Sequence, residues 1–450
     1  MRLSKHELID KKQNRINLSP PSLLALGFLS FIIVGTILLK LPFANHGDVD
    51  WMEALFTATS ATTITGLSVV NVGDAYTLFG KIIIMLLIQC GGLGFMTFAI
   101  LAALSLSPKV GLKQQIMAQE TIGQTSLARA TFTAKGVLIY SLFFEGVGTI
   151  ILTMAWMEHY DFKHAFFYAL FYSISAFNNG GFSLFPNSLM SFSDQYMVTF
   201  TISMLYMVGG LGFLVLMDIK RAKRWKTLST NSKLILSTIA GLNLFAFITI
   251  WALEAGNPLT LAPMSIGDQA LNAWFHATVP RSSGFNSLEV SSMTDASTLV
   301  TMMLMFIGGG SLSTAGGIKV GTFIITVLSV ITFLRRSDEL TVFKHSIPHH
   351  TTFKALAVIA ITSTLILIGF FTLLILEPNK RFLDLLFEAV SAACTVGLSR
   401  GVTEDLGHAS QFALILLMFA GRLGPLTLAY LIATPKKSRV SHPSTEIQIG

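Results

Sequence analysis

The chain has 450 residues, of which 52% are hydrophobic and only 12% are charged, whereas soluble domains carry roughly 25% charged residues. Polar side chains could not cover a globule of this size, so the composition excludes a soluble protein and predicts one that lies in a lipid bilayer. The net charge of +7 comes without a zinc-finger or RNA-binding signature and does not indicate nucleic-acid binding.

Eight long apolar runs follow one another along the chain, and we expect each of them to be a membrane-spanning helix. Each approaches or exceeds the roughly 20 residues that a helix needs to cross about 30 Å of hydrocarbon. The runs lie at approximately 22–41, 77–104, 136–156, 196–217, 234–254, 297–334, 355–377 and 411–433. Together they predict an all-α integral membrane protein with eight transmembrane helices.

A shorter apolar run lies between the two members of each pair of long runs. The four short runs lie at approximately 50–61, 164–177, 268–279 and 381–393. Their length of about 10 to 14 residues is typical of re-entrant segments. The chain therefore reads as four fused units, each made of a helix, a re-entrant pore helix, an extended loop and a second helix. We expect the units at 21–107, 133–218, 231–336 and 354–434, between tails at 1–20 and 435–450.

The four units share a fixed register. When Ser60, Ser175, Thr278 and Ser391 are aligned, an aromatic residue precedes each of them by four positions and a glycine follows six positions later. The glycines are Gly66, Gly181, Gly284 and Gly397, which are 115, 103 and 113 residues apart. A near-constant period of this kind indicates copies of one structural unit. We number these units as repeats 1 to 4 in chain order.

Basic residues divide unevenly between the two sets of connecting segments. Of the 31 Lys and Arg residues, 22 lie in the tails and the connections between repeats, six lie in the connections within repeats, and Lys40, Lys319 and Arg422 lie within apolar runs. Lys and Arg are retained on the cytoplasmic side in short loops. Both termini are therefore expected in the cytoplasm, with the pore helices entering from outside. Cys90 and Cys394 lie in apolar segments, which suggests no disulfide framework.

The extended loops after the pore helices have the features of an ion filter. Irregular backbone is tolerated at membrane depth only where it is buried in protein or lines an aqueous cavity, so four such loops around one axis predict one central pore. Glycine permits positive φ, which lets successive carbonyls point to one side. Rings of carbonyls replace the hydration shell of a potassium ion, and Thr-Val-Gly is the core of the known potassium filter loop. Thr395-Val396-Gly397 reproduces that core.

We expect K+ to bind at the carbonyls of four filter segments, one in each repeat. These are Thr63-Ile64-Thr65-Gly66, Asn178-Asn179-Gly180-Gly181, Arg281-Ser282-Ser283-Gly284 and Cys394-Thr395-Val396-Gly397. The first segment comes close to the Thr-Val-Gly pattern, whereas the second and third share only the glycine. A membrane-embedded enzyme is the least favoured alternative, because neither HExxH nor GxSxG occurs and no phosphate-loop or dinucleotide motif is present. No catalytic residue is therefore expected.

Two further glycine motifs accompany the filter segments. They are Gly91-Gly92-Leu93-Gly94-Phe95 and Gly209-Gly210-Leu211-Gly212-Phe213, which we interpret as close-packing surfaces between helices. With these motifs and the four filter segments, essentially the whole chain from about Leu18 resembles the membrane subunit of a Ktr-type bacterial potassium uptake system, in the superfamily of the Trk and HKT transporters. The resemblance implies one filter glycine per unit, a homodimer and a bacterial cytoplasmic membrane. The second segment has Asn-Gly-Gly where relatives often have Asn-Ala-Gly, which leaves Gly181 as the filter glycine.

The resemblance also implies a partner. Ktr relatives work with a separate cytoplasmic ring of nucleotide-binding subunits, which the short basic loops of this chain would contact. No cofactor is expected in the chain itself, and a regulatory nucleotide belongs to the partner. The residues leave open whether uptake depends on sodium or is driven by the membrane potential. A sodium-conducting or sodium-coupled transporter of the same superfamily is the main alternative, since some relatives carry Ser at the position of Gly66; four glycines favour potassium.

The long run of repeat 3 contains a glycine-dominated segment that should not be helical. Each glycine costs up to about 1 kcal/mol relative to alanine in a helix. The residues assigned to this gate segment are Gly308, Gly309, Gly310, Ser311, Ser313, Thr314, Ala315, Gly316 and Gly317. The resemblance makes the break an intramembrane gate loop under the filter, and a static kink is the alternative.

Four polar residues within apolar runs need a separate interpretation. Arg422 is costly in lipid and therefore functional by default; by resemblance it lies beneath the filter, where it would oppose cations, anchor the gate segment or cap its free carbonyls. Lys319 is the lesser candidate, because its side chain can extend toward the cytoplasm. Glu145 is interpreted as a packed, hydrogen-bonded or neutral residue, with a role in ion coupling left open. His276 is interpreted as a hydrogen-bonded packing residue, since no second metal ligand lies three or four positions away.

Overall fold

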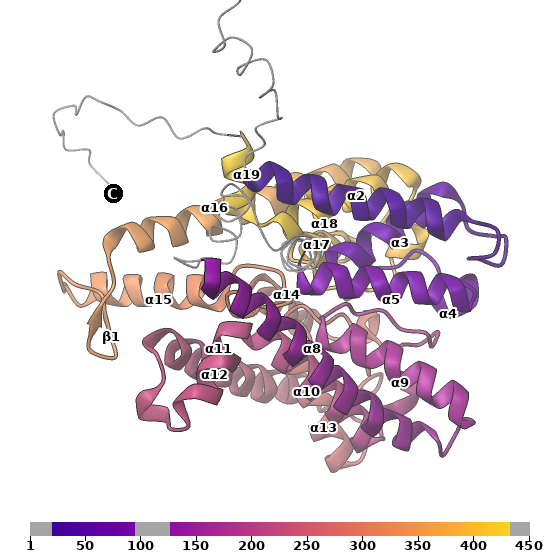
Figure 1. Cartoon of the computed structure of the whole chain (residues 1–450), viewed down its shortest axis with the longest axis horizontal. Coiled ribbons are helices and arrows are strands. Elements are labelled where there is room, and N and C mark those ends of the chain that lie inside the picture. The colour runs from indigo at the N-terminus through magenta and orange to yellow at the C-terminus, as the bar shows by residue number, and fades with distance from the viewer. Residues whose placement is uncertain (1–19, 95–126, 433–450) are drawn as a thin grey trace, which may run out of the picture.

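A computed structural model of the chain describes residues 20–94 and 127–432 (Figure 1). The predicted tails, apart from Pro20, and the part of the 77–104 run beyond residue 94 lie outside the described residues. Within the described part, regular structure is almost entirely helical. The only strands there are β1 (Thr341–Val342) and β2 (His345–Ser346), an antiparallel hairpin that pairs Thr341 with Ser346 and Val342 with His345.

Repeats 1 and 2 have the expected order of helix, pore helix and second helix. Repeat 1 contains α2 (Pro20–Lys40), α3 (Trp51–Thr63), α4 (Val72–Ala75) and α5 (Leu78–Leu93). Repeat 2 contains α8 (Leu127–Trp156), α9 (Phe162–Phe177), the 3-10 helix η1 (Met190–Phe192) and α10 (Tyr196–Leu211), followed by α11 (Phe213–Ala222) and η2 (Trp225–Thr227). The pore helices α3 and α9 begin within two residues of the short apolar runs that predicted them.

Repeats 3 and 4 follow the same order. Repeat 3 contains α12 (Thr230–Glu254), α13 (Ile266–Thr278), η3 (Val290–Ser292), α14 (Asp295–Phe306) and α15 (Val320–Leu334). Repeat 4 contains α16 (His349–Leu376), α17 (Phe382–Ala393), η4 (Thr403–Asp405), α18 (His408–Leu423) and α19 (Pro425–Ile432). The expected break in the long run of repeat 3 is present, because residues 307–319 are not helical.

Side chains at the N-caps define where several of these helices begin. At α3, Asp50 Oδ1 accepts a hydrogen bond from Glu53 N, and the Glu53 carboxylate accepts one from Asp50 N, both at 2.7 Å. Ser265 and Thr294 cap α13 and α14 by accepting from backbone N–H groups three residues later. Such caps satisfy orphan N–H groups and contribute about 1 kcal/mol each. The entries to these helices therefore follow from local sequence.

Two second helices are interrupted where the sequence predicted continuous runs. The run at 196–217 is divided at Gly212, where α10 and α11 meet at 93°, and the run at 411–433 is divided at Gly424 between α18 and α19. Gly212 has φ of 98° and Gly424 has φ of 81°. This left-handed backbone is open to glycine and ends a right-handed helix. The prediction of one unbroken helix in each run was wrong for this reason.

Only the longest helices meet the length and composition expected of a membrane span. Among residues 20–94 and 127–432, these are Ala134–Trp156 within α8, Thr230–Glu254 and His349–Leu376, with the bent pair α10 and α11 as a fourth if it is counted as one span. The remaining apolar helices have 10–17 residues. Large apolar side chains such as Ile150, Phe245 and Phe371 are exposed on the long helices, as expected for surfaces that face lipid tails.

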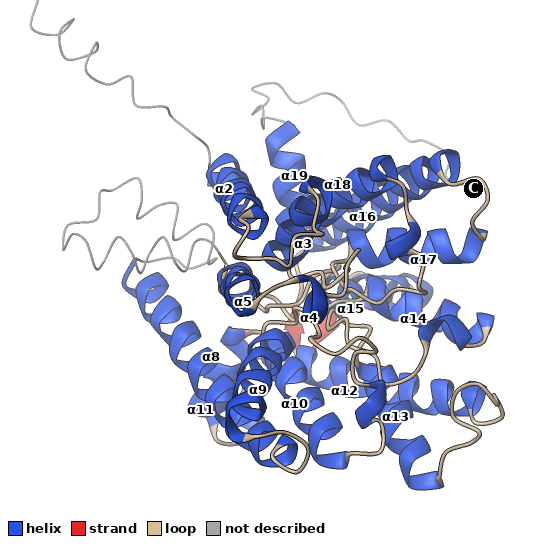
Figure 2. Ribbon diagram, turned by 90° about the vertical axis from the view of Figure 1, so that its right-hand side faces the viewer, coloured by secondary structure: helices blue, strands red, loops and turns tan. Residues whose placement is uncertain are grey.

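The four repeats pack around one another in a closed ring. Each second helix packs on the pore helix of the next repeat: α5 on α9, α10 on α13, α14 on α17, and finally α18 on α3. Nearly all residues in the C-terminal halves of the pore helices are buried. In Figure 2 the loops gather in the middle of the molecule with the helices around them. The ring therefore brings the ends of all four pore helices to one place.

Candidate functional site

The four predicted filter segments meet at their glycines. A Cβ added to Gly66 would lie 2.9 Å from Gly181 Cα, and one added to Gly181 would lie 2.9 Å from Gly284 Cα. A Cβ added to Gly284 would lie 3.4 Å from Gly397 Cα, and one added to Gly397 would lie 2.9 Å from Gly66 Cα and 2.0 Å from Thr65 O. The glycines thus form a closed ring in chain order, and it has no room for side chains.

The backbone has the same handedness pattern in all four segments. The glycines have φ of 92°, 70°, 75° and 92° in chain order. Two residues before each glycine, a non-glycine residue also has positive φ: Ile64 at 51°, Asn179 at 58°, Ser282 at 82° and Thr395 at 48°. Left-handed backbone at such residues costs about 1–3 kcal/mol and is found where the surroundings enforce a functional geometry. The sequence register predicted the glycines but gave no signal for the residues two positions earlier.

In repeats 1, 2 and 4 the aligned serine joins the pore helix to the loop that follows it. Gly66 N donates to Ser60 Oγ at 3.0 Å, and Gly397 N donates to Ser391 Oγ at 3.1 Å. In repeat 2, Ser175 Oγ donates to Phe182 O at 3.0 Å. In these three repeats the hydroxyl ties the loop back to the helix that precedes it, whereas Thr278 Oγ1 of repeat 3 donates to Trp274 O of its own helix at 2.9 Å.

Three pore helices also hold the outgoing part of their loops, through side chains eight or nine positions before the glycine. Tyr172 Oη accepts from Leu184 N at 3.1 Å. His276 Nε2 accepts from Leu288 N at 3.1 Å, so the prediction of a hydrogen-bonded His276 is confirmed. In repeat 4, Glu388 Oε1 accepts from Arg400 N at 3.2 Å. Sequence reasoning missed Tyr172 and Glu388. A large polar side chain near the middle of α9, α13 and α17 was the signal that could have found them.

Glu145 supports the second filter segment from behind. Its buried carboxylate accepts from Ser141 Oγ at 2.6 Å, from Asn178 Nδ2 at 2.9 Å and from Gln89 Nε2 at 3.1 Å. These donors come from α8 itself, from the filter segment and from α5. The structure therefore confirms a hydrogen-bonded role for Glu145, and it shows what the sequence did not, namely that the carboxylate holds Asn178.

The predicted gate segment lies directly against three filter segments. Asn179 Nδ2 donates to Thr314 Oγ1 at 2.6 Å, and Gly316 N donates to Ser282 Oγ at 2.8 Å. A Cβ added to Gly316 would lie 1.8 Å from Thr395 Oγ1. Residues of repeats 2, 3 and 4 therefore contact the same short loop, and the contacts require glycine at position 316.

The ends of the gate segment are held together, while its middle reaches across to α10. Gly308 N donates to Ile318 O at 2.9 Å, which closes the base of the loop. Gly310 N donates to Gly210 O at 2.8 Å, and Phe213 N donates to Leu312 O at 3.0 Å. The segment is thus an excursion between α14 and α15 that rests on the bend between α10 and α11.

Two basic residues contact carbonyls of the gate segment. Arg422 Nη1 donates to Thr314 O at 3.0 Å, Arg422 Nη2 donates to Gly91 O, and Lys319 Nζ donates to Ala315 O at 2.5 Å. Lys319 therefore turns back to the gate segment, where the carbonyl of Ala315 is its partner. Both side chains line a cavity of about 250 Å³ next to the gate segment.

The glycine motifs on the second helices allow those helices to touch the pore helices. A Cβ added to Gly91 would lie 2.1 Å from Thr62 O, one added to Gly209 would lie 1.9 Å from Phe177 O, and one added to Gly421 would lie 2.1 Å from the last carbonyl of α17. Each of these carbonyls lies four residues before a filter glycine. The interpretation of both sequence motifs as close-packing surfaces is confirmed.

One filter residue directs its side chain away from the ring. Arg281 is buried, and its Nη2 donates to Asn243 Oδ1 of α12. Its neighbour Ser282 donates through Oγ to Thr395 O at 2.7 Å and so links the third and fourth segments. The backbone of Arg281 therefore belongs to the segment, while its side chain anchors the segment to α12.

The chain is similar to known transport proteins over nearly its whole length. The family model described as "TrkH: Cation transport protein" matches residues 28–442. "Ktr system potassium uptake protein B" of Bacillus subtilis is 42% identical over 98% of this chain and 99% of its own length, and the protein of the same name from Vibrio alginolyticus is 37% identical over 98% and 97%. "Potassium/sodium uptake protein NtpJ" of Enterococcus hirae is 31% identical over 98% and 100%.

A solved structure has the same fold. The crystal structure of the potassium transporter TrkH from Vibrio parahaemolyticus matches with a TM-score of 0.73 and covers 94% of this chain and 86% of that chain, at 18% sequence identity. With the family match over most of its length, the chain belongs to the TrkH family of cation transport proteins.

Proposed function

We propose that the chain takes up potassium ions across the cytoplasmic membrane of a bacterium, through a central pore formed by its four repeats. The observation that carries this proposal is the closed ring of four glycines with its repeated left-handed backbone. The ion is suggested by relatives named for potassium uptake that match the chain from end to end, and by the Thr-Val-Gly core of the fourth segment.

In the proposed pore, K+ binds at the backbone carbonyls of segments 63–66, 178–181, 281–284 and 394–397. Alternating handedness along each segment turns successive carbonyls to one side, which is the geometry that replaces an ion's hydration shell. The C-terminal ends of α3, α9, α13 and α17 add partial negative charge at the same place. Side chains at the ring would block this approach, so glycine is needed at positions 66, 181, 284 and 397.

The proposed pore units keep the sequence bounds 21–107, 133–218, 231–336 and 354–434, with eight transmembrane spans. The second spans of repeats 2, 3 and 4 are each completed by a continuation: α10 by α11, α14 by α15 and α18 by α19. Each break lies next to the gate segment or to Arg422. The gate segment 308–317 would close the pore beneath the filter, and its contacts with Asn179, Ser282 and Arg422 support that role.

We further propose that the protein is a homodimer that works with a cytoplasmic ring of nucleotide-binding subunits. Two relatives that match nearly the whole chain are named as components of a Ktr system, which supports a membrane component with partners. The connection between α11 and α12 and the β1–β2 hairpin lie at the same end of the molecule, opposite α4 (Figure 1). These basic segments are the proposed contact surface.

A sodium-conducting or sodium-coupled transporter is the second candidate function. It is favoured by the similarity to a relative that is named for uptake of both potassium and sodium. A sodium-conducting transporter would accumulate sodium, and a sodium-coupled one would need sodium for the uptake of potassium, so one experiment separates the candidates. Isotope uptake in a bacterium that lacks its own potassium uptake systems, with and without sodium, should show potassium accumulation by this chain; accumulation of sodium alone would contradict the proposal.

Topology gives an independent prediction. In a background without Cys90 and Cys394, single cysteines at the exposed positions Asp48, Asp194 and Glu404 should react with an impermeant thiol reagent added outside cells. Cysteines at the exposed positions Lys226 and Lys344 should react only after the membrane is opened. Labelling in the reverse pattern would overturn the orientation and with it the direction of uptake.

A further inference from the structure

Arg400 follows the fourth filter segment by three residues, and its side chain is only 2% exposed. Within its own repeat, Arg400 Nε donates to Asp384 Oδ1 of α17 at 2.7 Å. Its backbone N donates to Glu388 Oε1 at 3.2 Å, and the same carboxylate accepts from Thr403 Oγ1 at 2.8 Å. The outgoing part of the fourth loop is therefore fixed to its own pore helix at both the backbone and the side chain.

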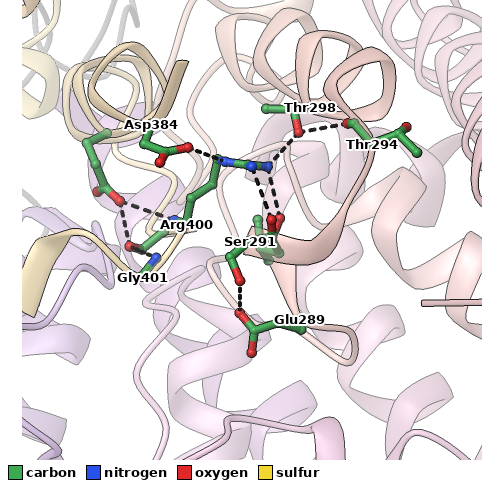
Figure 3. A network of polar contacts seen from close by, with 10 residues as sticks. Glu289, Ser291, Thr294, Thr298, Asp384, Arg400 and Gly401 are labelled. Carbon is green, nitrogen blue, oxygen red and sulfur yellow. Dashed lines mark hydrogen bonds and ion pairs between the residues drawn. The ribbon is translucent and has the colours of Figure 1, made fainter. Parts of the chain in front are cut away.

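The other end of the guanidinium reaches into repeat 3. Arg400 Nη1 donates to Thr298 Oγ1 at 2.7 Å and to Val290 O at 3.1 Å, while Nη2 donates to Ser291 O at 3.1 Å. Figure 3 shows Arg400 between Asp384 on one side and Ser291 and Thr298 on the other. A planar fork of N–H donors can hold partners on two sides in a fixed geometry. Arg400 therefore joins repeats 3 and 4 beside the filter.

Only the fourth loop carries an arginine three residues after its filter glycine. The positions three residues after the other filter glycines are Val69, Leu184 and Ser287, none of which carries a charge. The pore-helix residues that correspond to Glu388 are Thr57, Tyr172 and Phe275. The fourth loop, which also carries the Thr-Val-Gly core, is thus the one that an arginine ties to the preceding repeat.

We propose that Arg400 is a positioning residue that sets the distance between the third and fourth filter segments and so contributes to the preference for potassium over sodium. This inference rests on the proposed potassium pore. The two segments are in backbone contact, since a Cβ added to Gly284 would lie 2.9 Å from Val396 O and 3.4 Å from Gly397 Cα. Whether selectivity comes from cavity size or from carbonyl field strength, it depends on where these carbonyls lie. An outward shift of the fourth loop would therefore weaken the preference for potassium over sodium.

Replacement of Arg400 by lysine separates position from charge. Arg400→Lys keeps the positive charge near Asp384, but a single ammonium group cannot reach the partners in both repeats at once. We expect Arg400→Lys and Arg400→Gln each to lower the ratio of potassium to sodium uptake by about ten-fold, the scale of a lost hydrogen bond to a charged group. Arg381→Gln is the matched control, because Arg381 is an exposed arginine at the start of the same pore helix with no side-chain cap contact.

The measurement is isotope uptake by the full chain with its partner subunits, with sodium and potassium in competition, alongside the amount of folded protein extracted from membranes. A purely structural role for Arg400 would lower the amount of protein without changing the ion ratio. An unchanged ratio in folded Arg400→Lys would overturn the inference, as would a change of equal size in Arg381→Gln. If neither Arg400 variant folds, Thr298→Val removes one contact in repeat 3; a lower ratio supports the inference and an unchanged ratio overturns it. Absence of potassium uptake by the unmodified chain would instead refute the proposed function.

Discussion

Deletion of residues 311–315 should raise potassium flux through the membrane subunit by up to about 100-fold. The deleted residues include Thr314, which contacts Asn179 and Arg422, and the deletion also disturbs the bond from Gly316 N to Ser282. Three such contacts at about 1 kcal/mol each would favour the closed gate segment over the open one by about 100-fold. Gly308 N and Ile318 O are 2.9 Å apart at the base of the loop, so a shorter segment can still connect α14 to α15.

Arg422→Ala should move the flux in the same direction. Because both changes remove the contact between Arg422 and Thr314, their effects should be less than additive. Flux can be measured by isotope uptake into liposomes that contain the purified subunit. Gly321→Ala is a suitable control, since a Cβ there would meet nothing within 4 Å. Folded deletion protein with unchanged or lower flux would leave a static kink as the better interpretation of the segment.

Gly397→Ser should abolish potassium uptake, whereas Gly66→Ser should raise sodium uptake relative to potassium. A Cβ on Gly397 would lie 2.0 Å from Thr65 O, which is a backbone atom of the neighbouring filter segment and cannot move without distorting that segment. A Cβ on Gly66 would lie 2.7 Å from Gly180 O. Both changes displace carbonyls that are proposed to bind the ion, and selectivity is sensitive to their position.

A side chain at Gly66 or Gly397 would both strain the left-handed backbone and collide with the neighbouring segment, and a control must separate these two effects. Gly47 has φ of 102°, and a Cβ there would meet nothing within 4 Å, so Gly47→Ala tests strain alone at about 1–2 kcal/mol. This variant should keep normal uptake and normal selectivity in competition assays with both ions. Gly66→Ser protein that is folded and keeps its full preference for potassium would remove Gly66 from the filter.

Local signals predicted the pore helices and the interruption in repeat 3. Apolar runs of limited length located α3, α9, α13 and α17 to within two residues at their starts, because burial of an apolar helix is encoded in consecutive residues. The same reasoning treated Gly212 and Gly424 as parts of continuous helices. Whether a single glycine bends a helix depends on what packs against it, and at Gly212 the gate segment lies on the bend, where a Cβ would come within 2.4 Å of Ser311 O.

The sequence by itself determined a membrane protein of four repeats, one glycine in each loop and a break in the third repeat, since these features follow from composition and spacing. The tertiary structure alone decided which residues meet. Arg422 contacts a carbonyl 331 positions away, Asn179 contacts Thr314 across 135 positions, and Arg400 contacts Val290 across 110. Such pairs leave no periodic pattern in a single chain, because the contacts between helices, and not the spacing along the sequence, bring the two side chains together.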